Sequence, residues 1–353
     1  MNVQTKVKTQ NVNQLAGRWQ AYKAANPNVR IRNAAKELGV SEGELVATAC
    51  GTTATRIDAQ WGELLKELPE LGEVLVITRN DNAVHEKKGK FDNISIDPEH
   101  GLVLNREIDL RIFFGHWHYG FAVIEDTRRG LRHSLQFFDQ TGMSVHKVYL
   151  TENSNKAAYD KIVTQYRADD QVPLISPAKA SGIKDERTDS EIDVKALQDD
   201  WRALRDTHDF LSFLRKFDVT RTQALRLAGK DLASPVSIEA FERTLVGAAK
   251  TGLPIMIFVG NRGCLQIHTG PIKKIVKTQG WLNILDPGFD LHVLEDSIAQ
   301  AWVVRKPTRD GIVTSLELFD QNGQEILLMF GERKPGIKEL PEWTSLAESL
   351  VNS

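Results

Sequence analysis

The hydrophobic positions of the chain switch between helical and strand spacing twice. Residues 15–49 place apolar side chains three or four positions apart, which predicts amphipathic helices, and Ser41 followed by Glu44 has the spacing of a helix-capping box. Downstream, apolar residues alternate with polar ones or occur in short runs between turn residues, which predicts strands. Helical spacing returns over 194–250 and strand patterning follows over 254–330. This order predicts an α+β fold in which each half packs helices against a large antiparallel sheet.

The two halves are copies of one unit. The segment TRRGLRHSLQFFDQTG (127–142) aligns without gaps with TRDGIVTSLELFDQNG (308–323), and the same offset places Asn80 on Asn261. In both segments the DQ-x-G sequence predicts a hairpin turn whose glycine adopts a positive φ. The chain is therefore a tandem duplication, and residues kept in both copies are expected to be structural.

The segment between the copies has the composition of a linker. It contains two prolines and a run of charged residues. We expect a first repeat at 1–168, a linker at 169–193 and a second repeat at 194–353.

The composition is that of an ordinary globular protein: of 353 residues, 41% are hydrophobic and 26% are charged. A formal net charge of -2 argues against nucleic-acid binding through bulk phosphate neutralisation. The polar N-terminal segment lacks the apolar core of a signal peptide, and no apolar run approaches the roughly 18 residues that span a bilayer. Cys50 and Cys264 lie far apart, which fits free thiols in a reducing compartment, with a single disulfide as the alternative. We expect a cytoplasmic protein without stable membrane insertion.

One histidine has no counterpart in the other copy. In WRALRDTHDFLSFLRKF (201–217), helical spacing places His208 on an apolar stripe with Leu197, Trp201, Leu204, Leu211 and Leu214. A histidine on such a stripe is more often a hydrogen-bonded core residue than a ligand. The neighbouring carboxylates of Asp206 and Asp209 are candidates to orient the ring.

Two further features of the first copy differ from the second. Arg111 aligns with His292; in a strand, an arginine is most often ion-paired. His116 and His118 in GHWHYG share one face if that segment is a strand, which raises the alternative of a zinc site. Zinc normally takes three or four protein ligands, and no third ligand is nearby in the sequence. No nucleophile elbow, Walker loop, HExxH or GxGxxG motif is present.

Four segments carry a resemblance to a known family: LRDTHDFLSFLRKF, ITRNDNAVHEKKG, IDLRIFFGHWHYGFAV and SLQFFDQTGMSVHKVYL. They resemble the HemS/ChuS/ShuS/PhuS family of cytoplasmic haem proteins of Gram-negative bacteria, and the resemblance covers nearly the whole chain. It implies one haem b (iron protoporphyrin IX) in a cleft between the helical part and the sheets.

The resemblance also implies roles for individual residues. His208 matches the proximal iron ligand and Arg111 the distal residue. The remaining matches are Arg221, Lys306 and Arg333 for the propionates, Phe258 for an aromatic beside the porphyrin, and His85 for the ligand of a second haem site found in some relatives.

Two functions are compatible with these residues. A carrier would receive haem from an inner-membrane ABC importer and deliver it to a haem oxygenase. An enzyme would open the porphyrin ring itself with an external electron donor, and a distal cation such as Arg111 favours chemistry because it stabilises developing negative charge. A cofactor-free interaction protein, or a zinc protein using His116 and His118, is the remaining alternative.

Overall fold

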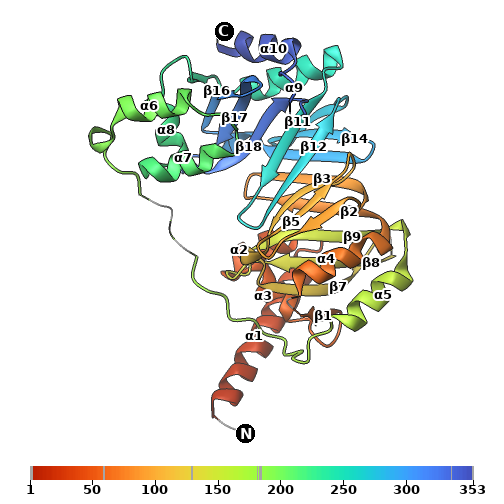
Figure 1. The fold of residues 1–353 in the computed structure, drawn as a ribbon. Coiled ribbons are helices and arrows are strands. Elements are labelled where there is room, and N and C mark those ends of the chain that lie inside the picture. The colour runs from red at the N-terminus through yellow and green to blue at the C-terminus, as the bar shows by residue number, and fades with distance from the viewer. Residues whose placement is uncertain are drawn as a thin grey trace. The chain divides into compact units, whose positions relative to one another are not determined.

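The computed structural model describes residues 3–58, 60–128, 130–180, 182, 185–334 and 336–351 (Figure 1). The chain divides into two compact units. Unit 1 consists of Met1–Arg79, Lys87–Ser181 and Asn261–Leu265, and unit 2 of Asn80–Glu86, Gly182–Gly260 and Gln266–Ser353. Each unit therefore contains a short segment from the other repeat.

Unit 1 begins with three helices and ends with one. Its main antiparallel sheet has the order β1-β7-β8-β9-β2, and a smaller antiparallel group has the order β4-β5-β6. The elements are α1 Val3–Ala25, α2 Ile31–Leu38, α3 Glu42–Ala47, β1 Ala54–Ile57, α4 Trp61–Glu67, η1 Leu68–Leu71, β2 Gly72–Arg79, β4 Ile94–Ile96, β5 His100–Leu104, β6 Asp109–Phe113, η2 Phe114–His116, β7 Tyr119–Thr127, β8 Gly130–Phe138, β9 Ser144–Ser154 and α5 Lys156–Gln165.

Unit 2 repeats this plan. Its main antiparallel sheet has the order β10-β16-β17-β18-β11, and its smaller group has the order β13-β14-β15. The strands β3 Ala83–Lys90 and β12 Cys264–Gly270 each contain residues of both units. The other elements are η3 Asp189–Glu191, α6 Val194–Arg202, α7 Asp209–Phe217, α8 Arg221–Leu227, β10 Ala233–Val236, α9 Ala240–Thr251, β11 Ile255–Gly260, β13 Ile275–Thr278, β14 Trp281–Asp286, β15 Phe289–Leu294, η4 Glu295–Ser297, β16 Gln300–Thr308, β17 Gly311–Phe319, β18 Glu325–Gly331 and α10 Pro341–Val351.

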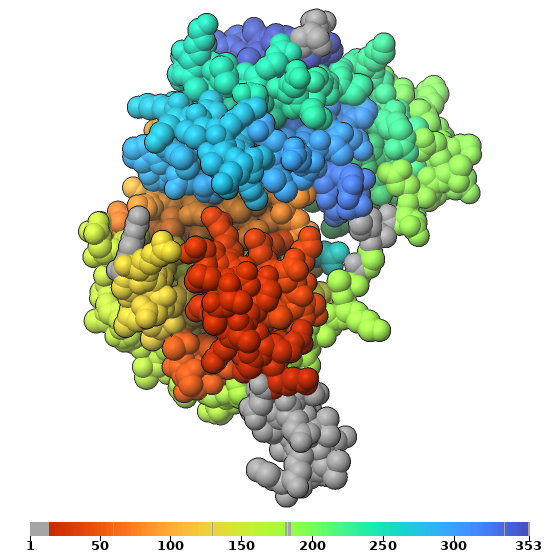
Figure 2. Space-filling view, turned by 180° about the vertical axis from the view of Figure 1, so that it is seen from behind, coloured from red at the N-terminus to blue at the C-terminus, as the bar shows by residue number. Residues whose placement is uncertain are grey.

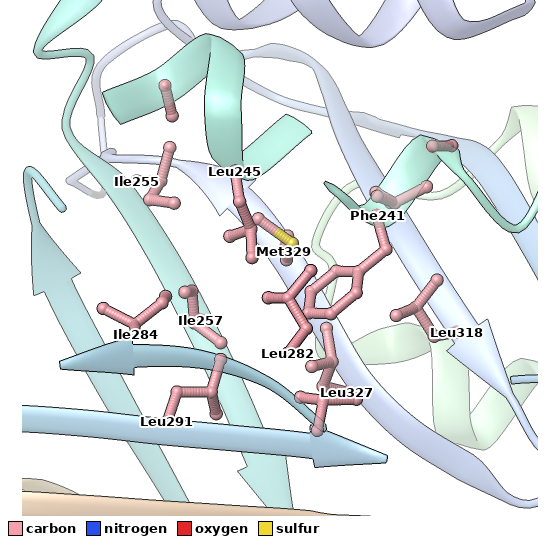
Figure 3. Close-up of a cluster of buried hydrophobic side chains, with 14 of the residues drawn as sticks. Phe241, Leu245, Ile255, Ile257, Leu282, Ile284, Leu291, Leu318, Leu327 and Met329 are labelled. Atoms are coloured by element: carbon pink, nitrogen blue, oxygen red, sulfur yellow. The ribbon is translucent and has the colours of Figure 1, made fainter. Parts of the chain in front are cut away.

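Each unit has its own hydrophobic core. In unit 2, side chains from α9 meet one face of the main sheet and the smaller strand group, as Figure 3 shows for Phe241, Leu245, Leu282, Leu318 and Met329. The opposite face of that sheet carries a second cluster, in which Trp201 and Phe210 from the helical region pack against Val304 and Phe319. The sheet of unit 2 thus has helices on both faces, α6 to α8 on one and α9 with α10 on the other.

The structure confirms the predicted α+β tandem duplication and several of its local signals. Ser41 and Glu44 form a capping box at the start of α3. Gly142 and Gly323 have φ values of 76° and 70°, as their hairpin turns require. Cys50 and Cys264 are free, buried thiols. Among the described residues, no helix is long and apolar enough to cross a membrane.

Three sequence expectations about the elements are wrong. The helical stretch 194–250 is interrupted by β10, and 201–217 is not one helix, because α6 ends at Arg202. Each copy also ends in a helix, α5 or α10, rather than in strands. The β10 strand contains Pro235, which is tolerated because β10 lies at the edge of the main sheet of unit 2.

Residues near both ends of the predicted linker form hydrogen bonds to the units. In unit 1, the Gln171 side chain extends the edge of β1, accepting the Arg56 N–H and donating to the Arg56 carbonyl, both at 2.9 Å. Ile175 is buried in the same unit. In unit 2, the Glu186 carboxylate accepts hydrogen bonds from Thr220 and Arg226. Much of the segment 169–193 therefore packs on a unit rather than forming a free tether.

Candidate functional site

His208 lies in the loop between α6 and α7, immediately before α7. Its side chain is 91% exposed, so the predicted place on a buried helical stripe is wrong. The Asp206 carboxylate accepts the backbone N–H of His208 at 2.9 Å, a local bond that competes with continuation of the helix. The buried face of α7 is instead formed by Phe210, Phe213 and Leu214, while Leu211 is 57% exposed.

The His208 imidazole is oriented by the same carboxylate. Its Nδ1 lies 2.6 Å from Asp206 Oδ1. Hydrogen bonds from the backbone N–H and side chain of His208, with the charge of Arg333, hold the pKa of Asp206 below its usual value despite partial burial. An ionised carboxylate only accepts, so in the neutral imidazole Nδ1 carries the proton and the lone pair is on Nε2. This is the arrangement found in metal-ligating histidines.

The loop that contains His208 is followed by Phe210, which packs against another aromatic side chain. Phe210 packs edge-on against Trp201, with ring centroids 4.7 Å apart. On its other side Phe210 covers two cations, with Lys306 Nζ at 4.5 Å and the Arg221 guanidinium carbon at 5.2 Å from the ring centroid. The backbone N–H of Arg309, in the β16–β17 turn, donates to the Arg205 carbonyl of the loop at 3.1 Å. These contacts fix the loop against one end of the main sheet.

The two cations beneath Phe210 belong to a buried ion cluster. Arg221 donates twice to the Glu317 carboxylate, at 2.7 and 2.8 Å, and Lys306 donates to it at 2.6 Å. Glu325 lies 3.3 Å from Arg221. Burial alone would raise the pKa of Glu317, but the charges of Arg221 and Lys306 outweigh it and hold that pKa far below its usual range. Both cations are thus already paired within the protein, and their predicted role at the propionates stays a prediction.

Beside this cluster lies an open apolar surface, which we call the platform: Met256 and Phe258 of β11 with Leu328 and Phe330 of β18. Phe258 pairs with Leu328 and Met256 with Phe330, so all four side chains project from the same face. The rings of Phe258 and Phe330 are 5.0 Å apart. All four are only partly buried, whereas the alternate residues of both strands face the core. The platform is next to the ion cluster because Leu328 also pairs with Glu317.

Sequence reasoning found Phe258 through the family resemblance but missed the other three platform residues. A signal was present: IMIFVG and EILLMF are apolar on both strand faces. Antiparallel sheets commonly have one face that meets solvent and is polar. Strands that are apolar on both faces therefore indicate that both faces are covered. Arg333 follows β18, is half-buried and lies close enough to act on Asp206.

The candidate distal residue belongs to unit 1. Arg111, on β6, donates through Nη1 to the Asp109 carboxylate and to the Leu110 carbonyl, and its side chain is 30% exposed. Burial raises the pKa of Asp109 although the neighbouring guanidinium opposes that effect. Arg111 is therefore ion-paired, while its Nε and Nη2 have no hydrogen-bond partner within the described part of the chain.

The remaining candidate histidines are placed differently. His85 is fully buried in unit 2, where its ring centroid lies 5.0 Å from that of Phe289, and Phe289 stacks on His268 at 3.8 Å. A second haem ligand at His85 would require this packing to open. His116 ends the short helix η2 and His118 follows it, so the expectation that they share one face of a strand is wrong. In the described ranges, no group of three or more histidine, cysteine or acidic residues is placed to hold a metal ion.

Comparison with known proteins places the chain in a family. Residues 39–166 and 218–350 each match the haemin-degrading HemS.ChuX domain. The chain belongs to this family. It is 40% identical over 332 residues to the hemin transport protein HemS of Yersinia enterocolitica, covering 94% of this chain and 95% of that protein. The double match confirms the duplication that the 181-residue offset predicts.

Solved structures agree over almost the full length. The structure of holo-PhuS, a heme-binding protein from Pseudomonas aeruginosa, superimposes with a TM-score of 0.94 and 44% identity, covering 96% of this chain and 99% of that chain. ChuS, an E. coli heme oxygenase, superimposes with a TM-score of 0.87 and 39% identity, covering 95% and 99%. The relatives therefore include one protein described as a transporter, one as a haem binder and one as an oxygenase.

Proposed function

We propose that this protein binds haem as cargo in the cytoplasm, with His208 Nε2 as the axial donor to the iron. The observation that carries the proposal is the exposed imidazole whose Nδ1 is already bonded to a carboxylate. A haem ligand needs the opposite nitrogen free and the ring held in one orientation, and both conditions are met here.

Unit 2 offers the kinds of side chain that a porphyrin site needs. Haem is a large apolar disc with two carboxylates, so its site needs apolar surface, a donor and cations at the edge. The platform supplies four apolar side chains with Phe258 among them. Arg333 is the cation we favour for a propionate, because it is half-buried and has no hydrogen-bond partner among the described residues. Arg221 and Lys306 would serve only by releasing Glu317.

We favour carriage over degradation as the main activity. In this proposal an inner-membrane ABC importer delivers haem and a haem oxygenase accepts it. A single histidine on an exposed loop is suited to transfer, because the receiving protein can approach the ligand. The degradative alternative rests on Arg111, whose free Nε and Nη2 donors could stabilise charge at the distal side.

The test is a hemin titration followed by absorbance. We expect His208→Ala to abolish most specific binding, because the iron–imidazole bond is lost while the platform still permits weak stacking. Asn28→Ala is the matched control, and its hemin binding should be unchanged. Asn28 lies in a loop of unit 1 and accepts a hydrogen bond at 2.9 Å from Arg128 in the β7–β8 turn, which is equivalent to the β16–β17 turn that contacts the His208 loop. An unaltered affinity and Soret band in His208→Ala would overturn the assignment. Loss of hemin binding in His116→Ala instead would favour a site formed by His116 and His118.

A further inference from the structure

The carboxylate beside His208 makes two hydrogen bonds to the same residue. One Asp206 oxygen, Oδ1, accepts both the His208 backbone N–H at 2.9 Å and the imidazole Nδ1 at 2.6 Å. The first bond shapes the loop, and the second acts on the ring. Because the two residues are only two positions apart, the loop that presents the histidine also brings its acceptor.

The second bond has an electronic consequence. A carboxylate that accepts from Nδ1–H pulls the proton away from the ring and gives the imidazole partial imidazolate character. Such a ring donates more strongly through Nε2, and it favours the higher oxidation state of a bound metal. A neutral amide in the same place would accept the bond without this effect, because its oxygen carries no full charge.

We infer that Asp206 is a positioning residue for the proposed haem ligand, which sets the tautomer of His208, strengthens its bond to iron and favours the ferric state. This inference rests on the proposed function. It identifies a residue that regulates how tightly haem is held, and therefore how readily the cargo is released to an acceptor.

Asp206 can be replaced without disturbing the packing beneath the loop. Asp206 is itself 58% exposed, so it is not tied to the core and its replacement leaves the packing of Phe210 and Trp201 intact. Asp209, the next carboxylate along the chain, is exposed, and among the described residues its side chain makes no hydrogen bond to His208, which makes it a matched control.

The experiment compares Asp206→Asn, Asp206→Ala and Asp209→Asn in the full-length protein. An asparagine keeps an acceptor for the backbone N–H, so the loop is preserved while the charge is removed. With hemin bound, we expect Asp206→Asn to raise the iron midpoint potential, to lower the iron–histidine stretching frequency of the ferrous form and to release haem to an excess of apomyoglobin roughly 10- to 100-fold faster. In the haem-free protein, nitrogen NMR of the His208 ring should show a smaller share of the Nδ1–H tautomer, because an amide oxygen accepts this hydrogen bond more weakly than a carboxylate does. Asp209→Asn should match the wild type in all four measurements.

The outcomes separate the possible failures. If Asp206→Asn behaves like the wild type and only Asp206→Ala is altered, the residue has a structural role alone and the inference is overturned. If His208→Ala retains the wild-type haem spectrum, the proposed ligand itself is wrong and the inference falls with it. Loss of haem in His208→Ala together with the expected shifts in Asp206→Asn supports both.

Discussion

The two units have equivalent main sheets, and the same face of each sheet differs between them. In unit 1 buried side chains occupy positions that are partly open in unit 2. In unit 2 this face carries the platform, with Leu328 and Phe330 partly open. In unit 1 the equivalent positions of the repeat are Lys147 and Tyr149, and both are buried. Lys147 forms an ion pair with Glu42 of α3, and the guanidinium of Arg132 stacks 3.6 Å above the Tyr149 ring.

The difference separates scaffold from function. Figure 2 shows the helices at the start of the chain, in red to orange, covering much of the visible face of unit 1. In unit 1 an ion pair between Lys147 and Glu42 occupies this face, where unit 2 has only the apolar Leu328. In unit 2 the charges are gathered to one side, in the cluster of Arg221, Lys306 and Glu317, and the apolar side chains beside them remain available. The duplication thus produced one unit whose sheet face is partly occupied by its own ion pair and one whose sheet face carries an open apolar surface.

The largest expected effect comes from separating the units. Fragments 1–181 and 182–353 should each fail to fold with the stability they have in the whole chain, because each lacks a segment that belongs to it. The first fragment loses the fully buried Cys264 and the Gly263 carbonyl, which accepts from Trp117 at 2.9 Å. The second loses Ala83 from its core. Circular dichroism with urea unfolding measures this, and mixing the fragments should restore both units. Independent, fully stable fragments would contradict it.

The next largest effect comes from replacing Lys147 of unit 1 with leucine, the residue that unit 2 has at the equivalent position, Leu328. Lys147→Leu should lower the free energy of unfolding of unit 1 by up to about 3–5 kcal/mol, because it removes the ammonium that donates to the buried Glu42 carboxylate. Burial raises the pKa of Glu42, but the charges of Lys147, Arg79 and Arg32 outweigh it and leave that pKa below its usual value.

The pH dependence of that pair follows from the direction of the shift. A carboxyl group whose pKa is lowered by folding stabilises the protein above the ordinary glutamate pKa, and the stabilisation is lost as the pH falls through the folded value. The difference in unfolding free energy between the wild type and Lys147→Leu should therefore shrink as the pH is lowered below about 4.5. A difference that grows in acid would contradict this account.

The reverse exchange tests the platform. Leu328→Lys places an ammonium on the partly exposed apolar surface, so its effect on folding should be small, about 1 kcal/mol or less. The carboxylate opposite it, Glu317, is already bonded to Arg221 and Lys306. Hemin affinity should fall roughly tenfold or more, because 1.4 kcal/mol is a factor of ten in Kd and covering this additional charge with an apolar ligand costs more than that. Lys334→Leu, a change at an exposed lysine after β18, is the control. Normal hemin binding by Leu328→Lys would place the ligand elsewhere.

The smallest expected effect on affinity is at Arg111, where unit 2 has His292. Arg111→Ala should bind hemin near the wild-type level, because most of the affinity is expected from burying the porphyrin and from the iron–imidazole bond, and neither uses this guanidinium. Its ferric spectrum should shift, and reductant-driven bleaching should slow about tenfold or more if the protein degrades haem. A variant that cannot bind hemin would mean that Arg111 builds the pocket, and one identical to the wild type would remove it from the distal side.

Much of the fold could be predicted from the sequence, because the signals that define it are local. The DQ-x-G turns bring their own stabilisation: Asp139 and Asp320 each accept backbone N–H groups two and four residues later. The 181-residue offset revealed the duplication for the same reason, since these turn residues cannot vary freely. The capping box at Ser41 is equally local.

The site was less predictable because it depends on interactions between distant residues. His208 could be singled out because the other copy has no matching histidine. Its exposure could not be predicted, because apolar spacing alone does not show that α6 ends at Arg202 and leaves His208 in a loop. The pairing of Arg221 and Lys306 with Glu317 joins three elements, and no sequence spacing encodes it. The platform required knowledge of which strand lies beside which.

The exchange of short segments between the units also bears on the ancestry of the chain. Asn80 donates to the carbonyls of Gly260 and Ile326, and Asn261 donates to those of Arg79 and Val145, so each repeat completes the other in the same way. A forerunner with a single repeat would have lacked this segment, and two identical copies would have had to swap it. Identical copies cannot diverge at separate positions. Fusion into one polypeptide removed that constraint. The first copy could then have the Lys147–Glu42 ion pair while the second had the open platform.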